Sequence, residues 1–427
     1  MKDNHNPISI PYGEQTISIS LPGKNLLSVI SPKVLPEVPE PVQTLERAYR
    51  SPIGAPLLAQ AVQGAKKVVI LADDLTRATP VNLIIPLLLN ELNAAGISDD
   101  QVGVIIALGT HRPMTEDEIH ARFGAGVIKR VPVLNNPWQD PTRMVAVGTT
   151  ENGTPVEISR LVLEAGFLVG VGSIVPHHII GFSGGAKIVQ PGITGPATTG
   201  GTHYLSTRTR RSYLGVVENL VRAEVETIAE QVGLNAIFNV VLDKQGQLVQ
   251  AFYGEPRLAH RAGVQVCQQI FGVPIPGQAD IVVASSHPCD IEFWQAHKSL
   301  YSADLAVKDG GTIIVVTPCP EGVSVTHPEM LAFTALEADQ IIKAIEQGEI
   351  QDQVSGALAL AWARIRQRAE VYLVSGGISI EETRALGFTP CEDVHSALEA
   401  ALRKHGPDAR VNVLPHAPET LPILSGG

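Results

Sequence analysis

The sequence has few cysteines and no excess of basic residues. Its four cysteines, Cys267, Cys289, Cys319 and Cys391, are scattered and form no C-x-x-C pair, which argues against a disulfide framework or a thiolate zinc site. The formal net charge is −11 at pH 7, whereas a nucleic-acid-binding protein carries a basic face. A local basic pocket can still lie on an acidic surface, so anionic small molecules remain possible ligands.

Long hydrophobic runs are also missing. The N-terminal stretch MKDNHNPISI has no apolar signal core, and no segment reaches the ~18 apolar residues of a membrane helix. We therefore expect a soluble, cytoplasmic protein. The composition, 44% hydrophobic and 18% charged, is typical of a folded globular chain, and 427 residues predict two domains.

A recurring unit of apolar strand, polar loop and helix runs through the chain. The strands are expected in KVVILAD (67–73), VGVIIALG (102–109), FLVGVGSIV (167–175), IVVAS (281–285), TIIVVTP (312–318), VYLVSGG (371–377) and VNVLP (411–415). Continuous β-branched runs between helices favour buried parallel strands. The sequence therefore predicts an α/β protein with two domains, largely parallel sheets and an active-site cleft between the domains.

The expected domain boundary lies near residue 272. There GVPIPGQAD (272–280) resembles a linker, so we assign residues 1–271 to a first, catalytic and cofactor-binding domain and 272–427 to a second. The last strand, within about 408–427, could belong to either domain. Within the first, ISIPY and TISISLP predict a hairpin around Gly13, and Thr115 with Glu118 predicts a capping box.

Polar motifs follow several of these strands. TR (76–77), TH (110–111) and PHH (176–178) come directly after apolar runs, and DIEFWQAHK (290–298) follows a later strand. Ligands in open α/β sheets bind beyond the carboxyl ends of the strands. We therefore expect these motifs to converge on one site.

The residue types in these motifs suit acid–base chemistry on an anion. The Arg77 guanidinium suits a carboxylate, although an ion pair with Asp74 is the simpler alternative. The imidazole of His111 suits general acid–base catalysis. His177 and His178 would point to opposite sides of an extended chain, so we expect one of them to act, and favour His177.

The segment HHIIGFSGGAKIVQPG (177–192) is not a phosphate loop, because Ile188 stands where that motif needs Ser or Thr after Lys187. Gly184 and Gly185 would instead let the backbone approach a bulky ligand, beside a lysine that is nucleophilic when desolvated. His203 is a candidate metal ligand, although no H-x-x-x-H pair accompanies it.

In the later motif, Gln295 and Lys298 are three residues apart and share one helical face. Trp294 lies four residues before Lys298 and is either a core side chain or part of the site.

Five motifs together resemble the lactate racemase family, the nickel-pincer enzymes, from the hairpin to about residue 380. They are DLTR (74–77), GTHRPMT (109–115), PHHIIGFSGGAK (176–187), GTHYLS (201–206) and CDIEFWQAHK (289–298). Their order matches the family, but they do not specify one substrate.

The resemblance implies a nickel-pincer nucleotide, the nickel complex of pyridinium-3,5-bisthiocarboxylic acid mononucleotide, which host proteins would synthesise. By motif, Lys187 matches the lysine that carries the cofactor, His203 the nickel ligand, and His111 and His177 the catalytic histidines. Arg77, Gln295 and Lys298 match substrate-binding residues, to which we add Trp294 and His178. We also assign Asp74, Thr76, Ser183 and Gly184 to cofactor binding.

The implied activity is an isomerase reaction, the inversion of C2 of a 2-hydroxy acid. One histidine takes the hydroxyl proton while hydride leaves C2, and the 2-keto acid is reduced on its other face. The chain departs from the family at Ala78, where proline is usual, at Trp294, where a smaller aromatic is common, and at His178, where an apolar residue occurs. We therefore expect a 2-hydroxy acid larger or more polar than lactate.

Two alternatives remain at this point. One is a zinc hydrolase that uses His111, His177 and His203. The other is a protein that binds the nickel cofactor without turnover, which has no need of two acid–base histidines. The sequence does not indicate the oligomeric state.

Overall fold

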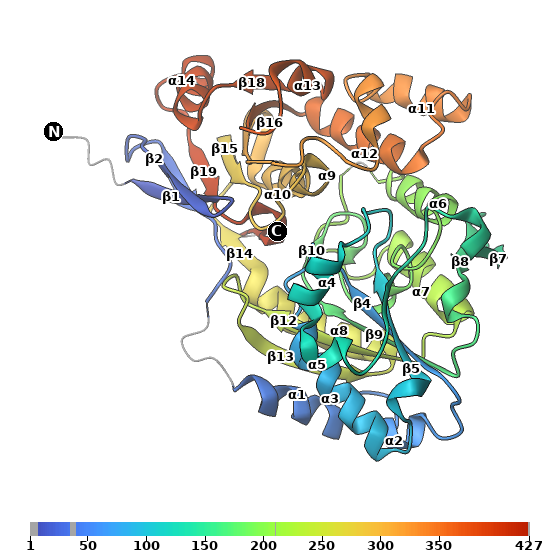
Figure 1. Ribbon diagram of the computed structural model, residues 1–427. Helices are drawn as coiled ribbons and strands as arrows, with labels where there is room; N and C mark the ends of the chain where they lie inside the picture. Colours follow the sequence, from blue (N-terminus) through green and yellow to red (C-terminus); the bar gives the residue numbers. More distant parts are fainter. Residues whose placement is uncertain (1–6, 35–39, 210, 426–427) are drawn as a thin grey trace.

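The computed structural model describes residues 7–34, 40–209 and 211–425, and it contains two six-stranded sheets (Figure 1). The first sheet has, in spatial order, β13 (Leu248–Gly254), β12 (Ala236–Leu242), β9 (Phe167–Ser173), β4 (Val68–Asp73), β5 (Val102–Ala107) and β6 (Val133–Asn135). The second has β18 (Thr389–Cys391), β17 (Ala369–Val374), β16 (Val307–Val316), β15 (Ala279–Ser285), β19 (Val411–Leu414) and β3 (Leu26–Val29). Only the β12–β13 pair is antiparallel within these two sheets. The α/β class with largely parallel sheets is thereby confirmed.

Helices cover both sheets. The helices that accompany the first sheet are α1 (Pro41–Arg50), α2 (Leu58–Ala61), α3 (Val81–Ala94), α4 (Glu116–Phe123), α5 (Ala125–Ile128), α6 (Pro196–Ser206), α7 (Leu220–Val232) and α8 (Pro256–Phe271). Those of the C-terminal half are α9 (Phe293–Ala296), α10 (Lys298–Ala306), α11 (Ala338–Glu346), α12 (Gln353–Arg366), α13 (Ile380–Ala385) and α14 (Val394–His405). The 3₁₀ turns are η1 (Asp99–Gln101), η2 (Pro141–Arg143), η3 (Arg160–Val162), η4 (Gly185–Ile188), η5 (Pro328–Ala332) and η6 (Ala417–Glu419). Among the described residues, no helix is long and apolar enough to cross a membrane.

The strand sequences are continuously apolar because both faces of each sheet are buried. In β4, Val69 and Leu71 pack into the core between the two sheets, while Val68 and Ile70 pack beneath the first sheet. In β15, Val282 faces the same central core and its neighbours face the opposite side. The central core is therefore shared by both halves of the chain.

Small paired elements complete the fold, namely β1 (Ile8–Tyr12) with β2 (Gln15–Ile19), β7 (Met144–Thr149) with β8 (Pro155–Ser159), β10 (Pro176–His177) with β11 (Gly181–Phe182), and β14 (Gly272–Ile275) with β20 (Leu421–Leu424). The predicted hairpin around Gly13 is confirmed as β1–β2. The expected capping box is also present, since Thr115 Oγ1 accepts from the Glu118 amide at 3.2 Å and Glu118 accepts from the Thr115 amide at 2.8 Å.

Two expectations about chain organisation need correction. The segment expected to be a linker contains β14, because its backbone pairs in parallel with β20. Residues 8–29, which we assigned to the first domain by sequence position, pack with the second sheet: β3 pairs with β19, and Ile10 and Ile19 of the hairpin share a core with Ile281. Figure 1 shows the β1–β2 hairpin on the side of β19. Neither β19 nor β20 joins the first sheet. The boundary near residue 272 stays a prediction.

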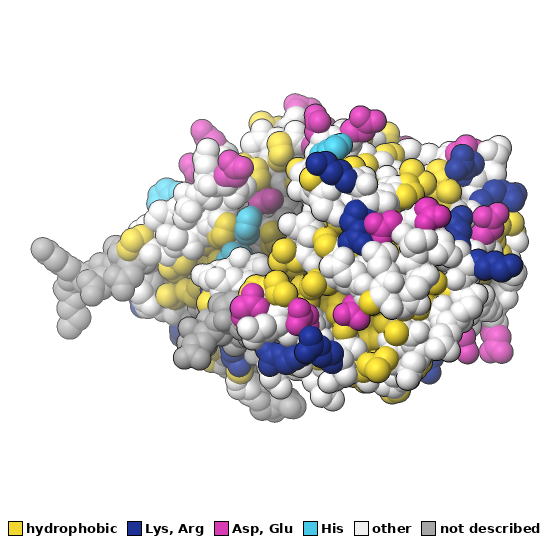
Figure 2. Space-filling model, turned by 60° about the horizontal axis from the view of Figure 1, so that its bottom comes forward, with side chains coloured by type: hydrophobic (Ala, Val, Ile, Leu, Met, Phe, Trp, Pro, Cys, Tyr) yellow, Lys and Arg dark blue, Asp and Glu magenta, His cyan; other side chains and the backbone are white. Residues whose placement is uncertain are grey.

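The face drawn in Figure 2 has acidic and basic side chains interspersed among apolar and neutral groups, with no broad field of one sign. The charges that matter for ligand binding are instead gathered inside the molecule.

Candidate active site

A cavity of about 110 Å³ lies beyond the carboxyl ends of β4, β5 and β9, and helices α9 and α10 of the C-terminal half close it. Every site residue that the sequence suggested lines this cavity: Asp74, Thr76, Arg77, His111, His177, His178, Ser183, Gly184, Lys187, His203, Trp294, Gln295 and Lys298. The expected convergence of the motifs is thus confirmed as geometry, while the chemical roles of the residues stay predictions.

His111 is held by a carboxylate on one side and an amide on the other. Its Nδ1 lies 2.6 Å from Asp74 Oδ2, and its Nε2 lies 2.9 Å from Gln295 Nε2. Asp74 in turn accepts hydrogen bonds from the amide and the hydroxyl of Thr76. Since a carboxylate accepts the Nδ1 proton and an amide nitrogen donates to Nε2, the neutral ring presents a basic Nε2. Asp74 therefore orients His111, a link that sequence reasoning missed.

The charge balance at Asp74 supports this arrangement. Burial raises the pKa of Asp74, but the hydrogen bonds that His111 and Thr76 donate, with the positive charge of Arg77, outweigh burial and hold the pKa well below its usual value. Asp74 is thus a carboxylate at neutral pH. The alternative of a simple Arg77–Asp74 ion pair is not formed, and within the described residues the Arg77 side chain donates only to the Thr76 carbonyl, at 3.1 Å.

His177 is held in the complementary way. Its Nδ1 accepts the backbone amide of Ile179 at 3.3 Å, so the proton of the neutral ring is on Nε2. Burial, together with the positive charge of Lys187, lowers the pKa of His177 well below its usual value. The two histidines thus offer one acceptor nitrogen and one donor nitrogen.

The expectation that His177 and His178 point to opposite sides is wrong. Their rings are stacked with centroids 4.8 Å apart and planes 14° from parallel, and both line the same cavity. The alternation of an extended strand does not apply, because β10 ends at His177 and the chain turns at His178. His178 also stacks on Tyr301, with centroids 4.0 Å apart.

The glycine pair before Lys187 has a steric reason. Gly184 and Gly185 have φ values of +74° and +61°, and a Cβ on Gly184 would lie 2.7 Å from Asn239 Oδ1 and from Ile174 Cγ1. Asn239 also accepts the Gly185 amide at 2.7 Å, and the buried Arg222 donates to the carbonyl of Gly184 at 3.3 Å. This tight turn places Lys187 in η4, in the cavity.

Sequence reasoning missed Asn239 and Arg222. Asn239 carried a usable signal, since it is a polar residue inside the apolar strand AIFNVVL. A buried polar group in such a strand needs a partner, and here that partner is the Lys187 loop. Ser183, which we assigned to cofactor binding, also closes this loop: its Oγ donates to Ser173 O at 2.8 Å and accepts the Val175 amide at 2.9 Å.

The electrostatics of the cavity favour an anionic ligand. Arg77, Lys187 and Lys298 line it, whereas Asp73 is paired with Arg122 at 2.7 Å and Asp74 is bonded to His111. Burial lowers the pKa of Lys298 to about 8, with Arg77 contributing, and it lowers the pKa of Lys187 well below its usual value. The Lys298 ammonium donates to Gln295 Oε1, so the two side chains lie together, although α9 ends at Ala296 and Lys298 begins α10.

His203 is suited to hold a metal. Its Nδ1 lies 2.8 Å from the Thr199 carbonyl, one helical turn earlier in α6, so Nδ1 carries the proton and Nε2 keeps its lone pair. A metal-binding histidine typically donates its other N–H in this way. Burial, with the charge of Lys187, lowers the pKa of His203 to about 4, which keeps the ring neutral and able to coordinate. The residues present therefore fit a nickel-bearing cofactor between Lys187 and His203.

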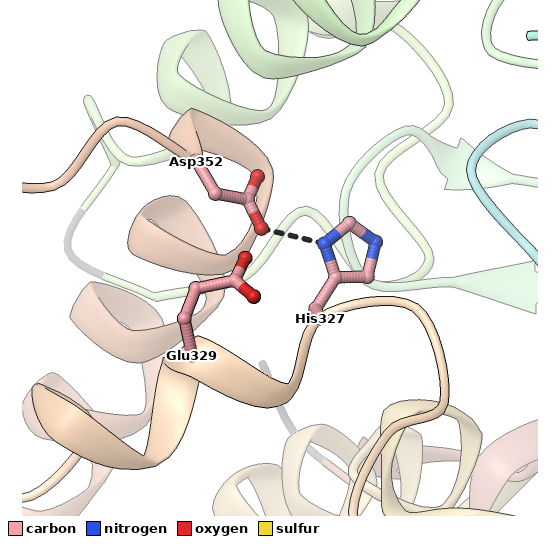
Figure 3. A group of neighbouring side chains, drawn as sticks. All are labelled: His327, Glu329 and Asp352. Carbon is pink, nitrogen blue, oxygen red and sulfur yellow. Dashed lines mark hydrogen bonds and ion pairs between the residues drawn. The ribbon is translucent and has the colours of Figure 1, made fainter. Parts of the chain in front are cut away.

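A separate group, His327, Glu329 and Asp352, brings three potential ligand atoms within 4.8 Å of one another (Figure 3). His327 Nδ1 lies 2.5 Å from Asp352 Oδ2, and its other ring nitrogen points away from both carboxylates. Asp352 also accepts the Val354 amide at 3.0 Å at the start of α12. This group is an ion pair at a helix N-cap, and Trp294 stacks on His327 with centroids 3.9 Å apart.

His111, His177 and His203 do not form such a group in the described part of the chain, because their ring nitrogens do not all come within 4.8 Å of one another. The geometry therefore gives no support to the zinc hydrolase alternative.

Comparison with known proteins identifies the family. The sequence matches the lactate racemase N-terminal domain over residues 12–215 and the lactate racemase C-terminal domain over 276–419. It is 30% identical to the lactate racemase of Thermoanaerobacterium thermosaccharolyticum, over 96% of this chain and 97% of that one. It is 27% identical to the lactate racemase of Lactiplantibacillus plantarum, again over 96% and 97% of the two chains.

The solved structures agree. The lactate racemase apoprotein of T. thermosaccharolyticum superposes with a TM-score of 0.88 at 28% identity, covering 98% of this chain and 100% of that one. A Thermotoga maritima protein shares the fold, with a TM-score of 0.72 at 19% identity over 92% and 100% of the two chains. The chain therefore belongs to the lactate racemase family of isomerases.

Proposed function

We propose that the chain inverts C2 of a 2-hydroxy acid by proton-coupled hydride transfer, with a nickel-pincer nucleotide as cofactor. The observation that carries this proposal is that His111 and His177, one offering an acceptor nitrogen and one a donor, open onto one cationic cavity. Family membership supports the racemase class, and the geometry supports the division of roles.

The cofactor would be held by Lys187 and His203. Burial lowers the pKa of Lys187 well below its usual value, which favours the nucleophilic form of the amine, and His203 offers its Nε2 to the metal. When bound, this cofactor supplies a reversible acceptor for the hydride of C2. Intact mass of the loaded chain reports whether Lys187 is covalently linked, and the host enzymes that make the cofactor are the partners that the proposal requires.

The protein itself binds the acid and moves its proton. Arg77 and Lys298 bind the carboxylate, and burial strengthens both ion pairs. His111, whose Nδ1 proton is held by Asp74, accepts the hydroxyl proton at Nε2 once the substrate hydroxyl replaces the Gln295 amide there. His177 faces the substrate with its Nε2 proton and stabilises the oxygen from the other side. When hydride returns to the other face of C2, the ring that took the proton gives it back to the oxygen. For the opposite enantiomer the two histidines exchange roles, which requires His177 to present an unprotonated Nε2.

The test is co-expression with cofactor-making enzymes, followed by a screen of chiral 2-hydroxy acids for loss of optical purity. Deuterium at C2 is expected to slow turnover, because a C–H bond breaks. His111→Ala and His177→Ala are each expected to lower kcat by at least about 10²-fold. His395→Ala, on the exposed face of α14, is the matched control and keeps full activity. Binding of the nickel cofactor without racemisation of any acid would support the binding-protein alternative.

The substrate is proposed to be larger or more polar than lactate. Trp294 and His178, two of the three positions that depart from the family, both line the cavity. Efficient racemisation of lactate with no turnover of bulkier acids would contradict this part of the proposal.

A further inference from the structure

A second cavity of about 30 Å³ adjoins the first. The two share four lining residues, His178, Ile179, His203 and Leu358, so these side chains are where the cavities adjoin. The second cavity lies between the chain that follows α6 and helices α10 and α12, away from Arg77.

His178 lines both cavities. The residue is 5% exposed, and neither ring nitrogen has a hydrogen-bond partner among the described residues. Burying a polar group without a partner is unfavourable, so an unpaired imidazole in a cavity wall indicates a polar ligand that supplies the missing bonds.

The charged side chains that line the second cavity indicate the chemical class of its ligand. Three arginines line it, Arg211, Arg364 and Arg368. Arg368 pairs with Asp304 at 2.6 Å and Arg211 with Asp309 at 3.6 Å, whereas Arg364 forms no ion pair within the described residues. Arg364 uses Nη1 for the carbonyls of Thr207 and Thr209, and no hydrogen bond from its Nε or Nη2 is formed within the described residues. A guanidinium edge next to an unpaired imidazole suits a carboxylate or phosphate oxygen.

We infer that the second cavity is an anion subsite for the far end of a molecule whose reacting end occupies the main cavity. This inference rests on the proposed function. The anion is either the second acidic group of a 2-hydroxy diacid or the phosphate of the nucleotide cofactor, which share the same chemistry. His178 donates a ring N–H to an oxygen of the anion, and Arg364 binds its charge.

The experiment compares two five-carbon acids by calorimetry, 2-hydroxypentanedioate and 2-hydroxypentanoate, which differ in the distal carboxylate. The cofactor-free chain is expected to bind the diacid at least about tenfold more tightly. Arg364→Gln is expected to abolish this preference and leave the monoacid unaffected, while Arg364→Lys, which keeps the charge, retains part of it. Arg366→Gln is the matched control, since Arg366 lies on the same helix and binds the carbonyls of Leu336 and Leu386 outside both cavities.

The cofactor-loaded chain separates the two sources of the anion. If the loaded chain still prefers the diacid to the monoacid, the subsite belongs to the substrate. If loading removes this preference, the subsite belongs to the phosphate of the cofactor. In that case Arg364→Gln also lowers the nickel retained after dialysis. Equal binding of the two acids by the cofactor-free chain, or an equal loss of both with Arg364→Gln, overturns the inference. Racemisation is measured separately on the loaded chain, so an inactive enzyme that keeps the preference refutes the proposed function and leaves the subsite standing.

Discussion

At the scale of single residues, the site depends on the hydrogen bonds that fix each titratable group. His111 and His177 are chemically identical side chains, yet Asp74 accepts a hydrogen bond from Nδ1 of one, whereas the Ile179 amide donates to Nδ1 of the other and leaves it protonated at Nε2. The sequence shows both histidines but not this difference, because the partners come from chain segments that only the fold brings together.

Lys298 gives a pH prediction. Burial lowers its pKa to about 8, so the side chain is charged below that pH and neutral above it. We expect kcat/KM for the acid to fall by about tenfold per pH unit above pH 8, because kcat/KM reports the free enzyme and the carboxylate loses a cation. Lys298→Arg, which stays charged, is expected to remove this decline from the profile. A flat wild-type profile up to about pH 10 would contradict the assignment.

Gly184 gives a stability prediction. A Cβ at this position would meet Asn239 and Ile174 at 2.7 Å, and φ is +74°. Gly348 has φ +71° with nothing within 4 Å, so Gly348→Ala measures backbone strain alone, about 1–2 kcal/mol. Gly184→Ala is expected to lower the unfolding free energy, measured in urea, by clearly more than Gly348→Ala does. It is also expected to reduce labelling of Lys187 by amine reagents. Equal costs for the two substitutions would show that the loop accommodates a side chain.

At the scale of elements, strands and capped helices could be predicted from the sequence because their signals are local. The apolar runs of β4, β5, β9 and β15 reflect burial on both faces, and the Thr115 capping box lies within four residues. The stacking of His177 on His178 could not be predicted, because it depends on where a two-residue strand ends. The strand inside the expected linker was missed because its partner, β20, is distant in sequence.

Helix α12 gives a prediction of its own. Asp352 caps this helix and also pairs with His327. Asp393 caps α14 in the same way, through the Ser396 amide at 2.7 Å, without a buried ion pair. Asp393→Ala should therefore cost about 1 kcal/mol of unfolding free energy, and Asp352→Ala a further ~1.5–3 kcal/mol.

The pH dependence of the difference in unfolding free energy between Asp352→Ala and Asp393→Ala tests the contribution of the ion pair. Burial raises the pKa of Asp352, but the hydrogen bond and charge of His327 outweigh it and lower the pKa below its usual value. The extra stability is thus present above the ordinary pKa of aspartate and is lost as the pH falls towards the lowered value. A difference between the two variants that persists in strong acid would rule out the ion pair as its source.

At the scale of the whole molecule, the two halves of the chain are joined by a shared core and by the N-terminal strands. Ile10, at the centre of the hairpin, is fully buried against the second sheet. Ile10→Ala is expected to lower the unfolding free energy by about 2–5 kcal/mol in a denaturant titration, and the partly buried Ile8→Ala by less. An unchanged unfolding free energy for Ile10→Ala would mean that packing of the hairpin against the second sheet does not stabilise the fold.

The pairing of β3 with β19 has a consequence for biosynthesis. Ser28 donates to Asn412 across 384 residues. At ribosomal speeds of about 5–20 residues per second, roughly 20–80 s separate the emergence of the two strands. Throughout that interval the early strand offers an uncovered edge to neighbouring nascent chains, so the yield of native protein should depend on chaperones that bind the first thirty residues.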